Sequence, residues 1–298
     1  MEDIKQEGGL EGRKKIGLAL GGGGAKGLAH IGVIKILEKA EVPIDFIAGT
    51  SMGALVGGWY AVTKNIFALE KLFQGIDEKD ILPMEKLLAD HGGALFSDKT
   101  LVELLRLGFG SKKCDDCQIP FVAVATDVES GEEVVLKDGE MVEVIEASVA
   151  LPIIFKPVKI GNRLLMDGGF VNPVPADVVR AMGADFVIAV DVASRWVSIP
   201  SDDLEDLKQT KNMYDFVHQL MTGLQYNIAK HVLEKADTVI KVPLTTFSWM
   251  EFNRAAEIIK RGEDGAREKL KEIRKKSGYE NKIKRSVLEK FMINLFGE

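Results

Sequence analysis

The stretch FIAGTSMGALVGG, residues 46–58, reads as a strand, a tight turn and the start of a helix. Its first residues form a short apolar run that is typical of a buried strand. Ser51 stands between Gly49 and Gly53, which matches the pattern G-x-S-x-G. Bulky neighbours would collide where the backbone doubles back at a nucleophile elbow. The pattern therefore predicts an exposed, reactive Ser51, although a glycine-flanked turn of purely structural use satisfies it as well.

Outward from this stretch, short apolar runs alternate with helical patterns. The runs are continuously apolar, which is typical of parallel strands that are covered on both faces. We therefore expect an α/β fold, a three-layer α/β/α sandwich with a mostly parallel central sheet. The expected strands are 16–20, 45–49, 120–126, 163–167, 185–190 and 237–242, and the expected helices include 25–40, 52–63, 98–107, 174–182 and 203–235.

The chain has 298 residues, 46% of them hydrophobic, which is enough for a full-sized core. Since no repeat or proline-rich linker divides it, we expect one catalytic domain over 14–245. A helical, basic C-terminal extension over 246–298 is expected to pack on or beside this domain. Within it, a helix over 283–295 would be amphipathic and would either dock on the core or lie on an anionic membrane surface.

Composition excludes several other classes of protein. A net charge of −6 provides no basic face for nucleic acid. The N-terminus does not resemble a signal peptide, and the longest apolar window is rich in glycine and reads as core. We therefore expect a cytoplasmic protein, with peripheral membrane contact as an option. Cys114 and Cys117 lack the second pair that a zinc site needs, so they form either a redox pair or an incidental loop pair.

A second glycine-rich stretch, LALGGGGAKGLAHIG, occupies residues 18–32. Glycines that run from a strand into a helix leave N–H groups free to bind negative charge. A dinucleotide fold would need an acidic residue at the end of the second strand, where Ser51 and its neighbours stand. A Walker loop needs Gly-Lys-Ser/Thr, whereas Lys26 here precedes Gly27. The remaining use is an oxyanion hole for the charge that develops when a serine attacks a carbonyl.

A base for Ser51 is suggested by LLMDGGFVNPVP, residues 164–175, where Asp167 ends an expected strand. Carboxylates at the carboxyl ends of strands in an open α/β sheet point into the ligand crevice. An aspartate that only bonds its own backbone in an Asx-turn explains the same pattern. Asp167 is therefore a candidate base, and the Asx-turn stays open beside it.

The order glycine-rich loop, G-x-S-x-G and D-G-G resembles the patatin-like phospholipases. The stretches FVAVATDVESGEEVVL (121–136) and EASVALPIIFKPV (146–158) are similar to that family as well. The resemblance implies a serine acyl hydrolase of the lipase, phospholipase or carboxylesterase type, which acts on lipid acyl esters through an acyl-enzyme and needs no metal or organic cofactor. It implies a Ser51–Asp167 dyad without a histidine, elbow glycines Gly49 and Gly53, oxyanion donors at Gly22, Gly23, Gly24 and Met52, and support from Lys26.

Four points remain open beside this interpretation. His218 and His231 follow Asp167, so a Ser-Asp-His triad is formally possible, but both histidines lie in a helical pattern. His91 lies on a segment, 80–96, whose apolar residues predict either a lid or acyl groove, or plain core. The same acyl-enzyme would also serve an acyltransferase, and a low-turnover lipid-binding regulatory protein would keep the same pocket.

Overall fold

The computed structural model describes residues 13–75, 98–152, 154–193 and 210–279. Two regions that the sequence singles out lie outside these ranges. One is the predicted lid or groove over 80–96, which contains His91. The other is the predicted amphipathic helix over 283–295, so both stay predictions.

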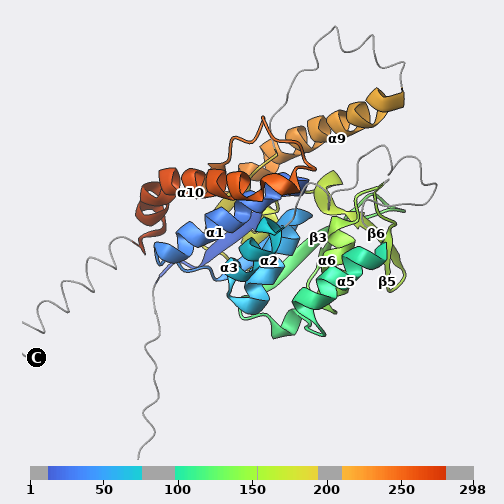
Figure 1. The fold of residues 1–298 in the computed structure, drawn as a ribbon. Helices are drawn as coiled ribbons and strands as arrows, with labels where there is room; N and C mark the ends of the chain where they lie inside the picture. Colours follow the sequence, from blue (N-terminus) through green and yellow to red (C-terminus); the bar gives the residue numbers. More distant parts are fainter. Residues whose placement is uncertain (1–12, 76–97, 153, 194–209, 280–298) are drawn as a thin grey trace, which may run out of the picture.

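The described strands form one eight-stranded mixed sheet (Figure 1). Its order is β5-β6-β3-β2-β1-β7-β8, and β4 also pairs with β3. The parallel strands are β1 (Ile16–Leu20), β2 (Phe46–Thr50), β3 (Phe121–Asp127), β7 (Phe186–Asp191) and β8 (Thr238–Lys241). The antiparallel strands are β4 (Glu133–Leu136), β5 (Val158–Ile160) and β6 (Arg163–Asp167). A mostly parallel sheet is confirmed, with an antiparallel edge that the apolar pattern does not predict.

Helices cover both faces of this sheet, which confirms the three-layer sandwich. One face carries α1 (Ala29–Lys39), α2 (Met52–Thr63), α3 (Ile66–Gln74), α5 (Asp98–Phe109), α6 (Met141–Val149) and α10 (Ala255–Ser277). The other face carries α7 (Ala176–Ala181) and α9 (Thr210–Leu233). Short 3-10 turns, η1 (Gly24–Leu28), η3 (Cys114–Asp116), η4 (Gly168–Phe170) and η6 (Phe252–Arg254), complete the described elements.

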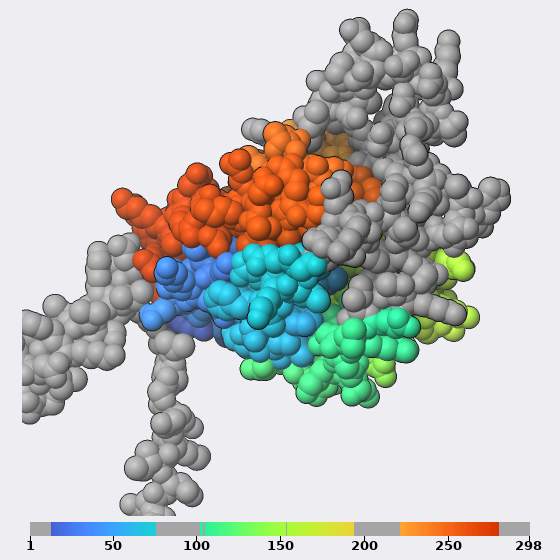
Figure 2. All heavy atoms as spheres, viewed as in Figure 1, coloured from blue at the N-terminus to red at the C-terminus, as the bar shows by residue number. Residues whose placement is uncertain are grey.

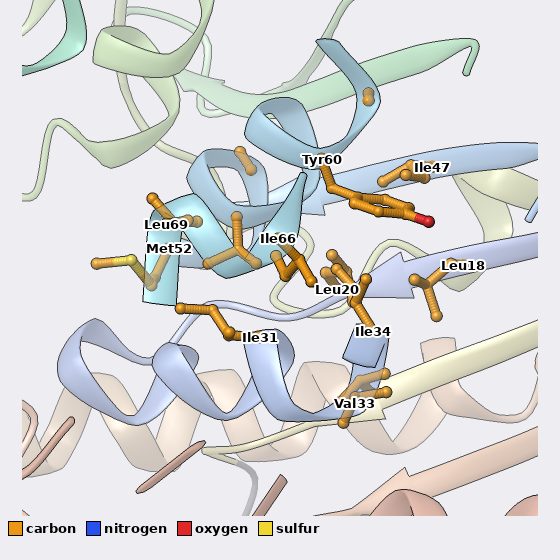
Figure 3. Packing of buried hydrophobic residues seen from close by; sticks show 14 of the residues in the cluster. Leu18, Leu20, Ile31, Val33, Ile34, Ile47, Met52, Tyr60, Ile66 and Leu69 are labelled. Carbon is orange, nitrogen blue, oxygen red and sulfur yellow. The ribbon is translucent and has the colours of Figure 1, made fainter. Parts of the chain in front are cut away.

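Alternation along β1 shows how the core divides into two layers. Leu18 and Leu20 pack with the helices of the first face, among them Ile31 and Ile34 of α1 (Figure 3). Ala19 points to the opposite face and packs in the second cluster. All of these side chains are fully buried. The strand is therefore continuously apolar because each face of the sheet is covered.

The described part of the C-terminal extension is joined closely to the rest of the fold. Helix α10 lies along α1 (Figures 1 and 2). A Cβ at Gly32 of α1 would lie 2.0 Å from the carbonyl oxygen of Ile259, and one at Gly262 would lie 1.9 Å from that of Ala29. The two glycines thus allow the helix backbones to touch, and α10 shares the main core. The division between residues 245 and 246 stays a prediction.

Candidate active site

Ser51 forms the turn between β2 and α2 in a strained backbone conformation. Its φ is 54° and its ψ is −126°, a combination that costs a non-glycine residue about 1–3 kcal/mol. Its carbonyl oxygen accepts hydrogen bonds from the N–H groups of Ala54 (2.8 Å) and Leu55 (3.1 Å). These bonds belong to the first turn of α2, so local structure holds Ser51 at the tip of the elbow.

A buried hydroxyl group supports the same turn from α6. The N–H of Ser51 donates to Oγ of Ser148 (3.0 Å), and Ser148 in turn donates to the carbonyl oxygen of Val124 in β3 (2.7 Å). Ser148 is fully buried. The sequence does not single out Ser148, because its position in a helical stretch says nothing of a contact with a residue 97 positions away.

The glycines beside Ser51 lie where no side chain fits. A Cβ at Gly53 would lie 2.1 Å from the carbonyl oxygen of Leu20, and one at Gly49 would lie 2.5 Å from Cα of Ala54. Gly22, from the glycine-rich loop, would bring a Cβ within 3.2 Å of the Cβ of Ser51. The elbow is therefore packed directly against the end of β1 and the loop that follows it.

Asp167 is buried and interacts with the Ser51 side chain. Its side chain is only 3% exposed, and burial raises its pKa to about 6, against the lowering effect of hydrogen bonds from the Ser51 hydroxyl and the Gly169 N–H. The Gly169 bond is 2.8 Å long, so the Asx-turn that the sequence left open is also present. The two interpretations of Asp167 are compatible, because its carboxyl group accepts the turn bond from Gly169 and interacts with the Ser51 hydroxyl at the same time.

The backbone of Asp167 is fixed by its neighbours. Its carbonyl oxygen accepts a bond from Oγ1 of Thr126 (2.8 Å), and its N–H donates to the carbonyl oxygen of Ala150 (3.0 Å). Asp167 ends β6 opposite Ala125 of β3. Asp167 ends a strand as predicted, and this strand runs antiparallel to β3, a direction that the sequence does not predict.

The glycine-rich loop lies against the elbow, and some of its N–H groups have no acceptor among the described residues. The N–H of Gly22 already donates to the carbonyl oxygen of Pro173 (2.9 Å). By contrast, no acceptor for the N–H groups of Gly23, Gly24 or Met52 is found among the described residues. Met52 opens α2, where N–H groups lack intrahelical partners. Three donors are thus available beside Ser51.

Lys26, which is predicted to support the oxyanion, and the histidines lie in different parts of the structure. Lys26 lines the site, and burial lowers its pKa while Glu251 raises it. His30 is fully buried, its Nε2 lies 2.7 Å from the carbonyl oxygen of Gly21, and burial lowers its pKa to about 4. A neutral His30 therefore donates to the glycine loop rather than acting on Ser51. His231 is exposed on α9, and the side chain of His218 lies outside the described part.

Ser51 and Asp167 open into an apolar cavity of about 410 Å³. Its walls come from α2, α3, α5, α9 and the segment before α10. Polar side chains are few among the described lining residues: Lys26, Ser51, Asp167, Thr222 and Gln225. An apolar cavity with a few convergent polar groups is the usual form of a small-molecule site.

The two cysteines and the candidate metal ligands add no second site in the described part of the chain. Burial raises the pKa of Cys114 to about 11 and that of Cys117 to about 12. Both thiols are therefore protonated at neutral pH and weakly nucleophilic. Within the described ranges, no group of three or more His, Cys, Asp or Glu residues could hold a metal ion, and no helix could span a membrane.

Comparisons with known proteins identify the family. The model of the patatin-like phospholipase family matches residues 18–180. Patatin-like phospholipase domain-containing protein 6 of Mus musculus is 36% identical over 185 residues, which is 60% of this chain and 14% of that protein. Lysophospholipase NTE1 of Candida glabrata is 28% identical over 278 residues, which is 84% of this chain and 16% of that protein. The chain therefore corresponds to a small part of these relatives.

A solved structure shares the fold. VipD from Legionella pneumophila aligns with a TM-score of 0.53 at 16% identity, covering 87% of this chain and 67% of that one. The family model spans more than half of the chain. With its glycine loop, serine elbow and aspartate gathered in one cavity, this chain belongs to the patatin-like phospholipase family.

Proposed function

We propose that this protein hydrolyses fatty-acyl esters of lipids, with Ser51 as the nucleophile and Asp167 as its base. The observation that carries the proposal is that a strained, elbow-borne Ser51 and a buried Asp167 interact where both line one apolar cavity. The names of the relatives, a phospholipase-domain protein and a lysophospholipase, support a lipid ester as the substrate class.

Asp167 is suited to take the Ser51 proton. Burial raises its pKa to about 6, so at neutral pH it is ionised and yet more basic than an ordinary carboxylate. As the proton moves to Asp167, Oγ of Ser51 attacks the ester carbonyl carbon and forms a tetrahedral intermediate. Collapse of that intermediate breaks the ester bond, the alcohol leaves with the proton from Asp167, and the acyl group stays on Ser51.

The negative charge of the intermediate needs donors that are in place beforehand. The N–H groups of Gly23, Gly24 and Met52 supply them in this proposal, because no described group accepts their hydrogen bonds. Gly22 instead allows the glycine loop to approach Ser51 closely, since its N–H already donates to the carbonyl oxygen of Pro173. Lys26 adds a positive charge nearby. Loss of a single donor of this kind typically slows a serine hydrolase about 10²–10³-fold.

Deacylation repeats the same chemistry with water. Asp167 takes a proton from a water molecule, the hydroxide attacks the acyl-enzyme, and Ser51 regains its proton as the fatty acid leaves. The steps require no metal or organic cofactor. If an alcohol takes the place of water, the same acyl-enzyme would produce a transferred acyl ester.

Labelling with an alkyl fluorophosphonate tests the nucleophile directly. We expect intact-mass analysis to show one adduct on the wild type and on Ser111→Ala, an exposed-serine control, and none on Ser51→Ala. Incubation with lysophosphatidylcholine should then release free fatty acid. Absence of an adduct on folded wild-type protein would contradict the proposal, and an acylated acceptor in place of free acid would turn it toward a transferase.

A further inference from the structure

Residues 247–252, which we call the Trp249 loop, connect the segment after β8 to α10. They lie outside the range that the family model matches. In the folded chain, however, Trp249 and Met250 line the same cavity as Ser51 and Asp167. The loop thus brings side chains from the C-terminal extension to a site whose Ser51, Asp167 and glycine-rich loop lie within the range that the family model matches.

Trp249 is in direct contact with the glycine-rich loop. Its carbonyl oxygen accepts a hydrogen bond from the N–H of Ala25 (2.7 Å). A Cβ at Gly24 would lie 2.4 Å from the same oxygen, and Gly24 has a φ of +56°. This contact occupies the N–H of Ala25 and fixes the chain immediately after Gly23 and Gly24, whose own N–H groups find no acceptor among the described residues.

The Trp249 loop is itself held by polar contacts. Oε2 of Glu251 accepts a hydrogen bond from the N–H of Ser248 (2.8 Å) and pairs with Nη1 of Arg254 (3.3 Å). The guanidinium of Arg254 lies 4.0 Å from the ring centroid of Phe247, at the other end of the loop. Glu251 therefore connects the loop to the start of α10 and limits its motion.

The same loop forms a wall along the apolar part of the cavity. The rings of Phe252 and Phe73, from η6 and α3, are stacked with centroids 6.2 Å apart, and both line the cavity. On α2, Ser51, Leu55 and Trp59 follow at four-residue steps, so the lining extends about 6 and 12 Å from Ser51 along the helix. Phe252 and Phe73 therefore add a pair of stacked aromatic rings to a lining that already reaches this far from Ser51.

We propose that the Trp249 loop is a positioning and specificity-determining part of the active site. Its backbone holds the glycine loop with the N–H groups of Gly23 and Gly24 free for the oxyanion, and Phe252 forms one wall of the acyl-chain site. This inference rests on the proposed acyl-ester chemistry and assigns to it the part of the chain that recognises a single long fatty-acyl group.

The wall is tested by chain-length preference. In Phe252→Ala we expect the ratio of kcat/KM for dodecanoyl to butyryl p-nitrophenyl esters to fall about tenfold, because only the longer chain reaches the lost ring. Phe67→Ala is the matched control, since Phe67 lies on α3 but is 60% exposed and does not line the cavity. Its ratio should change less than twofold, and an equal ratio in both variants would overturn the assignment of the wall.

The positioning role is tested with the two carboxylates that pair with Arg254. Glu251 belongs to the loop, whereas Glu257 is exposed on α10 and pairs with Nη2 of Arg254 at 2.7 Å. Glu251→Ala should lower kcat about tenfold on both ester lengths with little change in KM, and should slow fluorophosphonate labelling equally. Glu257→Ala should leave kcat within twofold. Equal kcat in the two variants would overturn the positioning role.

A binding measurement distinguishes a failure of this inference from a failure of the proposed hydrolase function. Dodecanoate binding to Ser51→Ala needs no turnover, and its Kd should rise about tenfold when Phe252→Ala is added. If wild-type protein fails to hydrolyse esters but this weakening is seen, the acyl wall stands and the hydrolase proposal fails. If hydrolysis occurs and neither the Kd nor the chain-length ratio responds, the hydrolase proposal stands and the wall fails.

Discussion

Ser51 and Asp167 reach the same site from two differently built regions of the sheet. Ser51 follows a parallel strand of the centre, whereas Asp167 ends the antiparallel strand β6, which lies between β3 and the edge strand β5. Carboxyl ends of antiparallel neighbours ordinarily lie at opposite ends of a sheet. Here Thr50 pairs with Val124, β3 continues to Asp127, and β6 returns along this overhang until Asp167 faces Ala125. The nucleophile thus depends on a local turn, and the base on long-range register.

The largest expected effect comes from removing either member of the pair. Ser51→Ala and Asp167→Asn should each lower kcat for ester hydrolysis about 10⁴-fold, because neither nucleophile nor base acts without the other. The double variant should lose little more than either single variant. Fatty-acid release measures kcat, and thermal unfolding confirms that the variants fold. If the fold-decreases in kcat of the two single variants multiplied in the double variant, the two residues would act independently.

A methyl group added to a glycine should lower the free energy of unfolding more at the crowded centre of the sheet than at its open edge. Gly53→Ala places a Cβ 2.1 Å from the carbonyl oxygen of Leu20, and we expect the free energy of unfolding to fall by about 3 kcal/mol. Gly161, in the β5–β6 turn, has a φ of +60°, and a Cβ there would meet nothing within 4 Å. Gly161→Ala should therefore cost only the backbone strain, about 1 kcal/mol.

Urea unfolding of both glycine variants measures the difference. Leu20 is fully buried, so β1 has no room to move away from the added methyl group in Gly53→Ala. If Gly53→Ala lowered the free energy of unfolding no more than Gly161→Ala, contact with the Leu20 carbonyl oxygen would not be what requires a glycine at position 53.

The contrast between a local turn and long-range register explains which features of the fold and the site could be predicted from the sequence. The elbow was predictable because its signals are local: an apolar strand, small residues on both sides of Ser51, and a helical pattern after it. The spans of β1, β6 and α2 were predicted to the residue for this reason. The direction of β6 was not predictable, since its five residues read alike in either orientation.

Contacts between residues that lie far apart in the sequence left no local sequence signal. Ser148 reads as an ordinary helical serine until α6 brings it between Val124 and the Ser51 N–H. Trp249 lies in the extension, and only the pairing of its carbonyl oxygen with Ala25 reveals its place beside the glycine loop. Strands β4 and β5 are short and partly exposed, so their apolar patterns are weak.

The buried base also carries a stability cost that depends on pH. The pKa of Asp167 rises from 3.8 to about 6 on folding, so the folded protein holds a proton that the unfolded chain releases between these values. The contribution of Asp167 to the free energy of unfolding therefore decreases as pH rises through this window and stays low above it. Asp167→Asn removes the charge and keeps an acceptor for the Gly169 N–H.

We accordingly expect Asp167→Asn to be more stable than the wild type by about 1–3 kcal/mol at pH 8 and nearly equal to it at pH 4. Urea unfolding at the two pH values measures this. Ser51→Ala should show the opposite dependence and be destabilised more at pH 8 than at pH 4, because it removes the Ser51 hydroxyl that lowers the pKa of Asp167. An Asp167→Asn variant that is less stable at pH 8 would indicate that the hydrogen bonds to ionised Asp167 outweigh its burial.

The smallest expected effect separates local from long-range support with two matched threonines. Thr50 of β2 donates to the carbonyl oxygen of Asn172, and Thr126 of β3 donates to that of Asp167, both at 2.8 Å. Both side chains are buried. Thr50→Val and Thr126→Val should therefore each lower the free energy of unfolding by about 1–2 kcal/mol, since each leaves a buried carbonyl without its partner.

Their effects on kcat should differ even though their effects on stability agree. Ser51 keeps its own bonds to α2 and Ser148 when Thr50 is changed, so kcat should stay within twofold. Asp167 loses an anchor of its own backbone when Thr126 is changed, so kcat should fall about three- to tenfold, a cost of about 1 kcal/mol in transition-state stabilisation. Equal falls in kcat would mean that the elbow, like the base, depends on contacts between distant strands rather than on its own turn.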